Sequence, residues 1–392
     1  MKSLSLAYLS RDRFPPLRPD VRVLFGQEFQ ELGHKVDWFL MAREPVEKSY
    51  STDFYSGRAW VTRNSSGALS RLKNLSKSFV KDFRFLFFGE RSYDFVVYKD
   101  QFFSAPFVML ACKLKGVDFV YWLSYPYHLE YDLAAKDKGK LITRLRSIVT
   151  EATLNHIIIP YSKHLFVQSE GMKDLLCNEV NKDKFTAVPM GFDRMRVENV
   201  IPTQHDVTKI AYLGVISRLR KVEFIVHAFS AAVNYGIEAK LCLVGGEEVS
   251  GDFEYIESII AELGLSDKVE MTGALDQKEA WSVVAGCDLC VAAVPEIPLY
   301  ECSSPTKVVE YMALGKPVVV NNIPDQRLLI EESGAGVCVN YNHEDFANAM
   351  VCMLANKEEL REMGERGRNY IMKSRTYEHI AAQVEKKLME LL

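Results

Sequence analysis

The sequence lacks most of the short motifs by which nucleotide-binding and metal-dependent enzymes are identified. It contains no G-x-G-x-x-G, which excludes the dinucleotide fingerprint, and no G-x-x-x-x-G-K-[ST], which excludes a P-loop. Neither H-E-x-x-H nor a cluster of cysteine and histidine at zinc spacing is present. There is also no Asp-x-Asp, the commonest short pattern for holding a metal ion against a sugar diphosphate. We therefore expect no metal ion and no organic cofactor.

Long apolar runs and a strong overall charge are also missing. No stretch reaches the ~18 apolar residues of a membrane span. The apolar start, residues 1–9, is too short for a secretory signal and is followed by charged residues. A formal net charge of −4 gives no reason to expect a nucleic-acid partner. The eight cysteines are scattered, as in proteins whose thiols stay reduced, so we expect a cytoplasmic location.

The charge that is present is unevenly distributed along the chain. Residues 1–200 carry a net charge of +7, and the remainder carries −11. The basic excess lies in residues 51–150, which hold 16 basic and 9 acidic side chains. A basic patch on one domain can attract anionic partners or lipid headgroups.

Short apolar runs alternate with amphipathic helical patterns along almost all of the 392 residues. This alternation predicts an α/β fold with parallel sheets and crossover helices. The periodicity stops at 194–208, so we expect two Rossmann-like, doubly wound domains, 1–200 and 207–375, facing a central cleft. The C-terminal helix, 376–392, could pack back on the first domain. The predicted strands are Leu4–Leu9, Lys35–Leu40, Phe95–Tyr98, Phe119–Leu123, Leu165–Gln168, Phe185–Val188, Ile210–Leu213, Lys240–Val244, Val269–Thr272, Leu289–Val294, Val318–Val320 and Gly336–Val339.

Residues 303–321, SSPTKVVEYMALGKPVVVN, predict a short helix with a clear beginning and end. Ser304 suits the N-cap and Pro305 the first helical position. Gly315 suits the left-handed position after the helix, and the next proline stops it. The apolar residues of this helix recur on one face, which we expect to be buried. They are Val308, Val309, Met312 and Ala313.

The polar residues of this helix are spaced to bind a nucleotide. Free N–H groups at a helix N-terminus bind phosphate, and Lys307 adds a formal charge in the first turn. Thr306 and Glu310 are four residues apart and share a face. Glu310 lies ~7.5 Å along the helix axis from Pro305, which suits a diphosphate at the tip and a ribose diol at the carboxylate. The alternative is a plain short helix with an exposed glutamate.

This segment resembles the donor-site signature of the retaining GT-B-fold glycosyltransferases, and more narrowly of their family 4 (glycosyl transferases group 1). The similarity is specific in the second half of the chain and much weaker before residue 160. Other segments resemble the family in the same order along the chain. They are Phe166–Glu170, Ala187–Asp193, Ile210–Gly214, Leu243–Gly246 and Val269–Gly273.

The resemblance implies a nucleoside-diphosphate sugar as donor and a glycan or lipid-linked acceptor, with retention of anomeric configuration. It further implies a role in polysaccharide or glycolipid synthesis. In that family a glutamate at the position of Glu310 binds the ribose, and basic residues after the first strand of the second domain meet the diphosphate. We prefer Arg220 among those basic residues. The expected donor-binding residues are Gly214, Arg218, Arg220, Lys221, Gly273, Ser304, Pro305, Thr306, Lys307 and Glu310.

The sequence departs from the family pattern at two positions. Val215 stands where the family usually has an arginine, and Cys302 stands where many relatives have a second glutamate. Glu301 is one residue away and could take that role. The loop around Tyr127 and His128 follows a predicted strand, where an acceptor hydroxyl would be met. The expected catalytic residues are thus His128, Glu301 and Glu310.

Two other functions fit the same two-domain frame. A nucleotide-sugar epimerase would bind a similar donor but need an acid/base pair and no acceptor. A catalytically inactive relative would bind the nucleotide alone, and Cys302 favours this alternative.

Residues 69–88 predict a helix at a membrane surface. Apolar residues recur there at helical spacing and basic residues lie among them. An equally good interpretation is a core-packing helix with a solvated basic face. On the first interpretation, we expect an anionic membrane surface as a partner, bound peripherally at the inner face of the membrane. The apolar residues are Leu72, Leu75, Phe79, Phe83 and Leu86, and the basic residues include Arg71, Lys73, Lys77 and Lys81. A second basic cluster is Lys136, Lys138, Lys140, Arg144 and Arg146.

Overall fold

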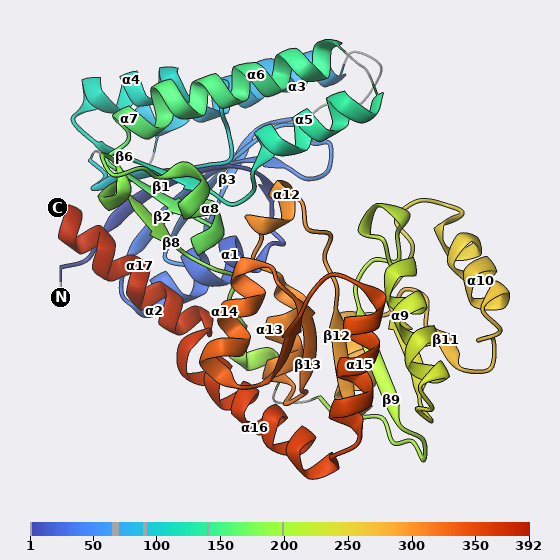
Figure 1. The fold of residues 1–392 in the computed structure, drawn as a ribbon. Helices are drawn as coiled ribbons and strands as arrows, with labels where there is room; N and C mark the ends of the chain where they lie inside the picture. The colour runs from blue at the N-terminus through green and yellow to red at the C-terminus, as the bar shows by residue number, and fades with distance from the viewer. Residues whose placement is uncertain (1, 65–69, 89–91, 139–140, 198–199) are drawn as a thin grey trace. The chain divides into compact units, whose positions relative to one another are not determined.

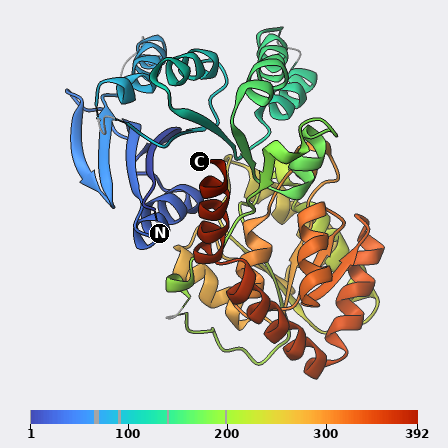
Figure 2. The same ribbon diagram turned by 90° about the vertical axis from the view of Figure 1, so that its left-hand side faces the viewer.

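The computed structural model describes residues 2–64, 70–88, 92–138, 141–197 and 200–392 (Figure 1). The chain forms two compact units. One consists of Met1–Pro189 with Tyr377–Leu392, and the other of Met190–Thr376. Each unit is built around its own sheet, flanked by helices (Figures 1 and 2). Within the described ranges, no helix is long and apolar enough to cross a membrane.

The sheet of the first unit has eight strands in the order β3-β4-β2-β1-β5-β6-β7-β8. Neighbouring strands run parallel except β3 and β4, which form an antiparallel hairpin. The strand order reverses between β1 and β5, which makes the carboxyl ends of these two strands the expected ligand-binding point. The strands are β1 Ser5–Phe14, β2 Lys35–Ala42, β3 Tyr50–Phe54, β4 Gly57–Thr62, β5 Phe95–Lys99, β6 Asp118–Leu123, β7 His164–Val167 and β8 Phe185–Ala187.

The helices of the first unit include the last helix of the chain. α17 packs Ile380, Val384 and Leu388 into the core of this unit, beside Leu4 and Leu6 of the N-terminal strand region. The helical elements are α1 Pro19–Val21, η1 Arg22–Glu28, α2 Phe29–Glu31, α3 Ser70–Asp82, η2 Arg84–Leu86, α4 Ala105–Lys115, α5 Tyr127–Lys138, α6 Leu141–Thr153, η3 Leu154–Ile158, α7 Ile159–Tyr161, α8 Glu170–Leu176, η4 Lys182–Lys184 and α17 Tyr377–Leu391.

The sheet of the second unit has six parallel strands in the order β11-β10-β9-β12-β13-β14. Its order reverses between β9 and β12, again marking the carboxyl ends of two strands. The strands are β9 Lys209–Leu213, β10 Lys240–Val244, β11 Val269–Met271, β12 Leu289–Ala292, β13 Val318–Asn321 and β14 Gly336–Val339. The helical elements are η5 Arg194–Arg196, η6 Arg218–Arg220, α9 Glu223–Asn234, α10 Asp252–Glu262, α11 Gln277–Gly286, α12 Pro298–Glu301, α13 Thr306–Ala313, α14 Pro324–Ser333, α15 His343–Leu354 and α16 Lys357–Ser374.

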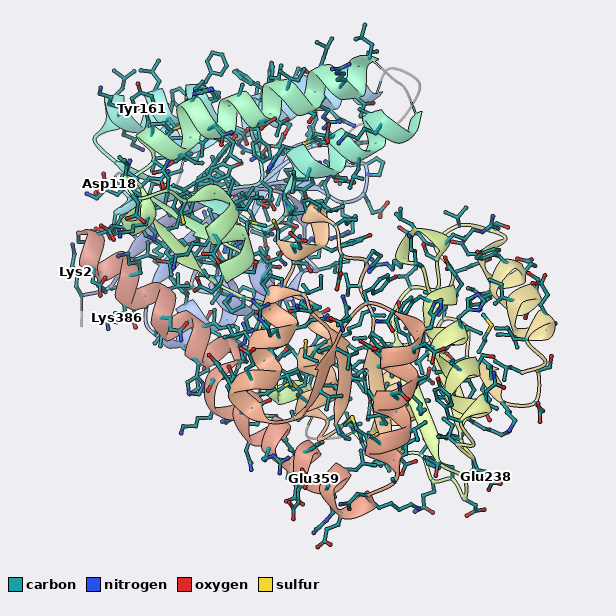
Figure 3. The ribbon with its side chains drawn as sticks, in the orientation of Figure 1. Lys2, Asp118, Tyr161, Glu238, Glu359 and Lys386 are labelled. Carbon is teal, nitrogen blue, oxygen red and sulfur yellow. The ribbon has the colours of Figure 1, made fainter. Side chains whose placement is uncertain are left out.

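The central strands of both sheets are buried on both faces, which is why their sequences read as continuous apolar runs. β12 and β13 are buried at every position. Charged side chains project instead from the outer elements. Lys2 and Lys386 of the first unit and Glu238 and Glu359 of the second are examples (Figure 3).

Each predicted strand is present, with bounds that differ by a few residues at most, apart from β1, which continues to Phe14. The hairpin β3–β4 was not predicted from the sequence. The predicted domain boundary near residue 200 is wrong, because the second unit begins at Met190. Phe192 fixes this earlier boundary. Its ring packs 5.4 Å from the ring of Trp281, and its N–H donates to the carbonyl of Arg375 at 2.8 Å.

Candidate functional site

Helix α13 begins one residue later than the sequence suggested. Pro305 is the N-cap residue, and no side chain caps the helix. The prediction that Ser304 caps it is wrong, because the Ser304 hydroxyl is used elsewhere. It donates to Asp325 Oδ2 at 2.7 Å and accepts from the Met190 N–H at 2.9 Å. The first N–H groups of α13 are therefore not satisfied by a capping side chain.

The packing of α13 holds its N-terminus at the carboxyl end of β9. Val308, Val309 and Met312 are buried, as predicted. Tyr311 is buried too, and its hydroxyl accepts from the Leu213 N–H, the last residue of β9, at 2.6 Å. Gly315 has φ +73°, the left-handed conformation expected after the helix.

Three glycines meet at the carboxyl ends of β9, β10 and β11. Gly214, Gly245 and Gly273 have φ values of +150°, +144° and +71°. Gly245 pairs with Gly273, and a Cβ atom on Gly245 would lie 2.0 Å from the carbonyl oxygen of Gly214. No side chain fits at this contact, so glycine at position 245 lets the loops after β9 and β10 pack closely against each other.

Lys307 reaches from the first turn of α13 to the glycine loop. Its Nζ donates to the Tyr212 hydroxyl at 3.1 Å and lies 4.2 Å from the centroid of the Tyr212 ring. A Cβ atom on Gly214 would be 3.3 Å from this Nζ. Among the residues that the structure describes, Lys307 has no carboxylate partner. Its charge is thus available to an anion beside Gly214.

Glu310 lies on the same helix, half-buried beside helix α11. Its Oε1 accepts from Gln277 Nε2 at 3.5 Å, and its carboxylate is also hydrogen-bonded by Trp281. Burial raises the pKa of Glu310 to about 7, against the opposing effect of the two hydrogen bonds and of Lys307. A further hydrogen-bond donor, such as a sugar diol, would stabilise the charged form of this carboxylate.

The basic side chains of the loop after β9 differ in whether they have partners within the protein. Arg218 donates to the Gly251 carbonyl at 2.8 Å and pairs with Asp252 at 3.3 Å. Its guanidinium is therefore directed toward α10. Arg220 and Lys221 are exposed, and in the described part of the chain neither side chain has an ion-pair partner. Their role in binding a diphosphate stays a prediction.

Glu301 ends the short helix α12 and is exposed, whereas the adjacent Cys302 is buried. Burial raises the pKa of the Cys302 thiol to about 12, so the thiol stays protonated. Cys302 cannot supply the negative charge of the glutamate that it replaces. Glu301 as its substitute stays a prediction.

The sequence suggested that His128 lies in a loop, but in the structure it lies in the first turn of α5 in the first unit. The side chain is buried, its Nδ1 has no hydrogen-bond partner, and burial lowers its pKa. The neutral imidazole could act as a base only if a ligand reached it. The catalytic role of His128 stays a prediction.

A pocket of about 680 Å³ lies at the carboxyl ends of β1 and β5 in the first unit. Asp100, directly after β5, takes a left-handed φ of +55°, which is unusual for a residue with a side chain and common at functional sites. Its carboxylate accepts from the Ser124 N–H at 2.8 Å and from the Ser124 hydroxyl. Sequence reasoning did not single out Asp100. The signal was the polar stretch Lys99-Asp100-Gln101 after a buried strand. Its lining residues include Arg11, Phe79, Phe102, Phe103, Ser104, Tyr131, Leu145, Arg146 and Val149.

The predicted membrane-surface helix exists as α3, but one of its basic residues is not at the surface. Lys81 is buried, pairs with Asp82 at 2.7 Å and donates to the Ser10 carbonyl at 2.7 Å. The side chains of Arg71, Leu72, Lys73 and Leu75 lie outside the described residues, as do those of Lys138 and Lys140.

Comparison with known families gives the second unit an identity. Residues 193–370 match the family model described as "Glycosyl transferases group 1". The second unit is a glycosyl transferases group 1 domain. The matched residues include Arg220, Lys307 and Glu310, whereas His128 and the pocket of the first unit lie before them.

A curated relative agrees with this assignment. An MMP α-(1→4)-mannosyltransferase of Mycolicibacterium hassiacum is 28% identical over 229 residues, 56% of this chain and 52% of that protein. The match thus spans about half the length of this relative. Because the match covers only about half of each protein, it supports the family assignment and does not identify the substrate of this chain.

The fold of the whole chain is shared more widely. A sucrose-phosphate synthase of Thermosynechococcus elongatus superposes with a TM-score of 0.70 at 19% identity, covering 99% of each chain. A UDP-forming α,α-trehalose-phosphate synthase of Burkholderia xenovorans gives 0.74 at 10% identity, covering 100% of this chain and 99% of that one. The Anabaena protein HepE, in complex with UDP and glucose, gives 0.66 at 14% identity, covering 99% and 100%. The group 1 domain and its companion unit therefore form the GT-B fold.

Proposed function

We propose that this chain is a glycosyltransferase that moves a sugar from a nucleoside-diphosphate sugar to a glycan or lipid-linked acceptor. The half-buried carboxylate of Glu310 carries this proposal. Glu310 lies on the same helix as an uncapped N-terminus and Lys307. The Nζ of Lys307 in turn lies beside Gly214, which has no side chain. The N–H groups and Lys307 would hold the diphosphate, and Glu310 would accept from the ribose hydroxyls.

The same groups would lower the barrier to transfer. Breaking the bond between the anomeric carbon and the diphosphate leaves negative charge on the leaving phosphate. Lys307, Arg220 and the helix N-terminus would stabilise that charge more strongly than the charge of the bound donor. In this scheme the reaction needs no metal ion. Retention of configuration is the outcome that the family resemblance implies.

The relatives support the choice of donor. The Anabaena HepE structure contains UDP and glucose, and one synthase is named as UDP-forming. We infer that the donor here is also a nucleoside-diphosphate sugar.

A panel of nucleoside diphosphates tests the function. We expect one of UDP, GDP or ADP to raise the melting temperature of the full chain, because a ligand that binds only the folded state stabilises it. The corresponding nucleotide sugar should then be consumed in the presence of acceptor, and excess EDTA should not stop this. Conversion of the donor without acceptor would identify an epimerase instead. Nucleotide binding without any turnover would identify an inactive relative, and a strict need for Mg²⁺ or Mn²⁺ would contradict the mechanism.

We further propose that the enzyme works at an anionic membrane surface. The support comes from an apolar stripe of exposed side chains on each of two helices of the first unit, α4 and α6 (Figure 1). Exposed basic side chains, among them Lys113 and Arg144, lie on the same two helices. Such a combination favours binding at a lipid headgroup layer. The stripe consists of Phe103, Phe107, Leu110 and Leu114 with Leu141, Ile142, Leu145, Ile148 and Val149.

A further inference from the structure

The pocket of the first unit combines two arginines with an apolar wall. The guanidinium of Arg11 lies 4.5 Å from the centroid of the Tyr127 ring and is hydrogen-bonded to the Tyr131 side chain. The guanidinium of Arg146 lies 4.2 Å from the centroid of the Tyr131 ring. Because Tyr127 and Tyr131 are one turn apart on α5, the two stacked guanidiniums converge on the same pocket.

These two arginines keep hydrogen-bonding capacity for a ligand. Within the described ranges, neither pairs with a carboxylate. Asp100 also lines the pocket, but both of its oxygens are bound by Ser124. Each stacked guanidinium therefore presents N–H groups that can bind an anion in bidentate fashion.

Two other polar residues of the lining, Ser104 and Gln101, have partners within the protein. Ser104 donates to Asp82 at 2.7 Å, and Gln101 donates to the other oxygen of Asp82 at 3.3 Å. The buried Lys81 pairs with that same carboxylate. The floor of the pocket therefore adds no unpaired negative charge that would repel an anion.

Besides the arginines, the pocket has an apolar wall that is open to solvent. Phe79, Phe103, Leu145 and Val149 line it, and the exposed fractions of Phe103 and Leu145 are 77% and 52%. The Phe79 ring packs 5.6 Å from the ring of Phe107, which connects this wall to the apolar stripe of α4. Leu145 and Val149 belong to the stripe of α6. The apolar side chains of the pocket wall thus belong to the exposed stripes of α4 and α6 or contact them.

We propose that this pocket binds the acceptor, and that the acceptor is an amphiphile with a phosphate head and an apolar chain. The proposal rests on the glycosyltransferase function proposed above. The phosphate binds Arg11 and Arg146, and the first part of the chain lies against Phe79, Phe103, Leu145 and Val149. A volume of about 680 Å³ holds a head group and a short length of chain, and the remainder of the chain continues along the stripe.

Titration of the full chain with decyl phosphate, below its critical micelle concentration, tests this assignment. We expect saturable binding at one site, with inorganic phosphate and decanol each binding about tenfold more weakly or worse. Arg146→Gln and Val149→Gln should each weaken decyl phosphate binding, by about tenfold for the arginine.

Two exposed residues outside the pocket and the stripe provide controls. Arg144→Gln matches the arginine change on the same helix and Val180→Gln matches the valine change, so decyl phosphate binding should be unchanged in both. Inorganic phosphate binding as tightly as decyl phosphate would make this a free-phosphate site and overturn the proposal. So would equal effects of Arg144→Gln and Arg146→Gln, or unchanged binding in a folded Arg146→Gln variant.

Nucleoside diphosphate binding, measured on the same samples, separates this proposal from the function it rests on. If the nucleotide binds and decyl phosphate does not, the acceptor assignment fails and the donor site stands. If decyl phosphate binds and no nucleoside diphosphate does, the pocket stands as an amphiphile site and the transferase function fails.

Discussion

The protonation state of one carboxyl group, that of Glu310, can be followed at the proposed donor site in the ligand-free protein. Burial raises its folded pKa to about 7, above the ~4.3 of an unperturbed glutamate. Folding therefore takes up a proton between these pH values, and the free energy of unfolding falls as the pH rises from about 4 to about 7. Above pH 7 the buried charge of Glu310 therefore lowers the free energy of unfolding of the ligand-free protein, a cost that is common at functional sites.

This reasoning predicts that Glu310→Gln stabilises the ligand-free protein at pH 8. The amide keeps the shape of the side chain and removes the cost of the buried charge. The gain should vanish near pH 4, where the wild-type carboxyl group is protonated in both the folded and the unfolded states. Urea unfolding at the two pH values measures this, and an equal effect of the substitution at both would show that burial does not control the charge.

Arg220 and Lys307 should act on phosphate and not on the nucleoside. Lys307→Ala and Arg220→Ala each remove one charge that is not paired with a carboxylate in the described structure. We expect each to weaken nucleoside diphosphate binding by about tenfold, as for loss of a charge-assisted hydrogen bond. Nucleoside binding is the control and should change little. Equal losses for both ligands would mean that neither side chain touches phosphate.

Individual residues were predictable from sequence where their roles depend on near neighbours. The positive φ of Gly315 and the buried face of α13 follow from local rules. The role of Ser304 was not predictable, because its partner Asp325 lies 21 residues away. Lys81 was misjudged for the same reason, since its acceptor is the carbonyl of Ser10 in another element.

At the scale of elements, the buried parallel strands were the most predictable part of the fold. Their apolar runs are long and uninterrupted, as in β13. The β3–β4 hairpin escaped notice because Tyr50–Phe54 is largely exposed and polar, and it lies at the sheet edge. The helical segment after β1 consists of three short elements, α1, η1 and α2, in which the helical hydrogen-bond pattern changes.

The last helix should be necessary for the stability of the first unit. Leu388 of α17 is fully buried in that core, so Leu388→Ala should lower the free energy of unfolding by about 2–5 kcal/mol. Lys386→Ala is the matched control, because Lys386 is exposed two residues earlier on the same helix (Figure 3). Urea unfolding of the full chain compares them. A loss no greater for Leu388→Ala than for Lys386→Ala would contradict the packing.

At the scale of the whole molecule, the sequence indicated two doubly wound domains and an uneven charge. The basic excess of residues 51–150 coincides with the part of the first unit that carries the apolar stripe. Sequence periodicity predicted a membrane-binding element on α3, which stays a prediction, and the exposed apolar side chains of the described residues add the stripes on α4 and α6. Periodicity shows that a helix has an apolar face, but only the fold shows whether that face is covered.

We predict salt-sensitive binding of the full chain to anionic vesicles, and none to neutral ones at the same salt concentration. Leu114→Gln with Ile142→Gln should weaken it, because both side chains are 81% exposed on the stripe. Val180→Gln is the control, since Val180 is 97% exposed outside the stripe. Vesicle co-sedimentation measures the effect. If the wild-type chain ignores anionic vesicles at low salt, a water-soluble acceptor becomes the better assignment.

The central claim is that a nucleoside diphosphate binds at α13 with its ribose on Glu310. The most direct test is calorimetric titration of the wild-type chain and of Glu310→Ala with the preferred nucleoside diphosphate. We predict that the substitution weakens binding by about tenfold or more, the loss of a hydrogen bond to a charged group, while the fold survives. Unchanged affinity in a well-folded Glu310→Ala variant would contradict the assignment of this site.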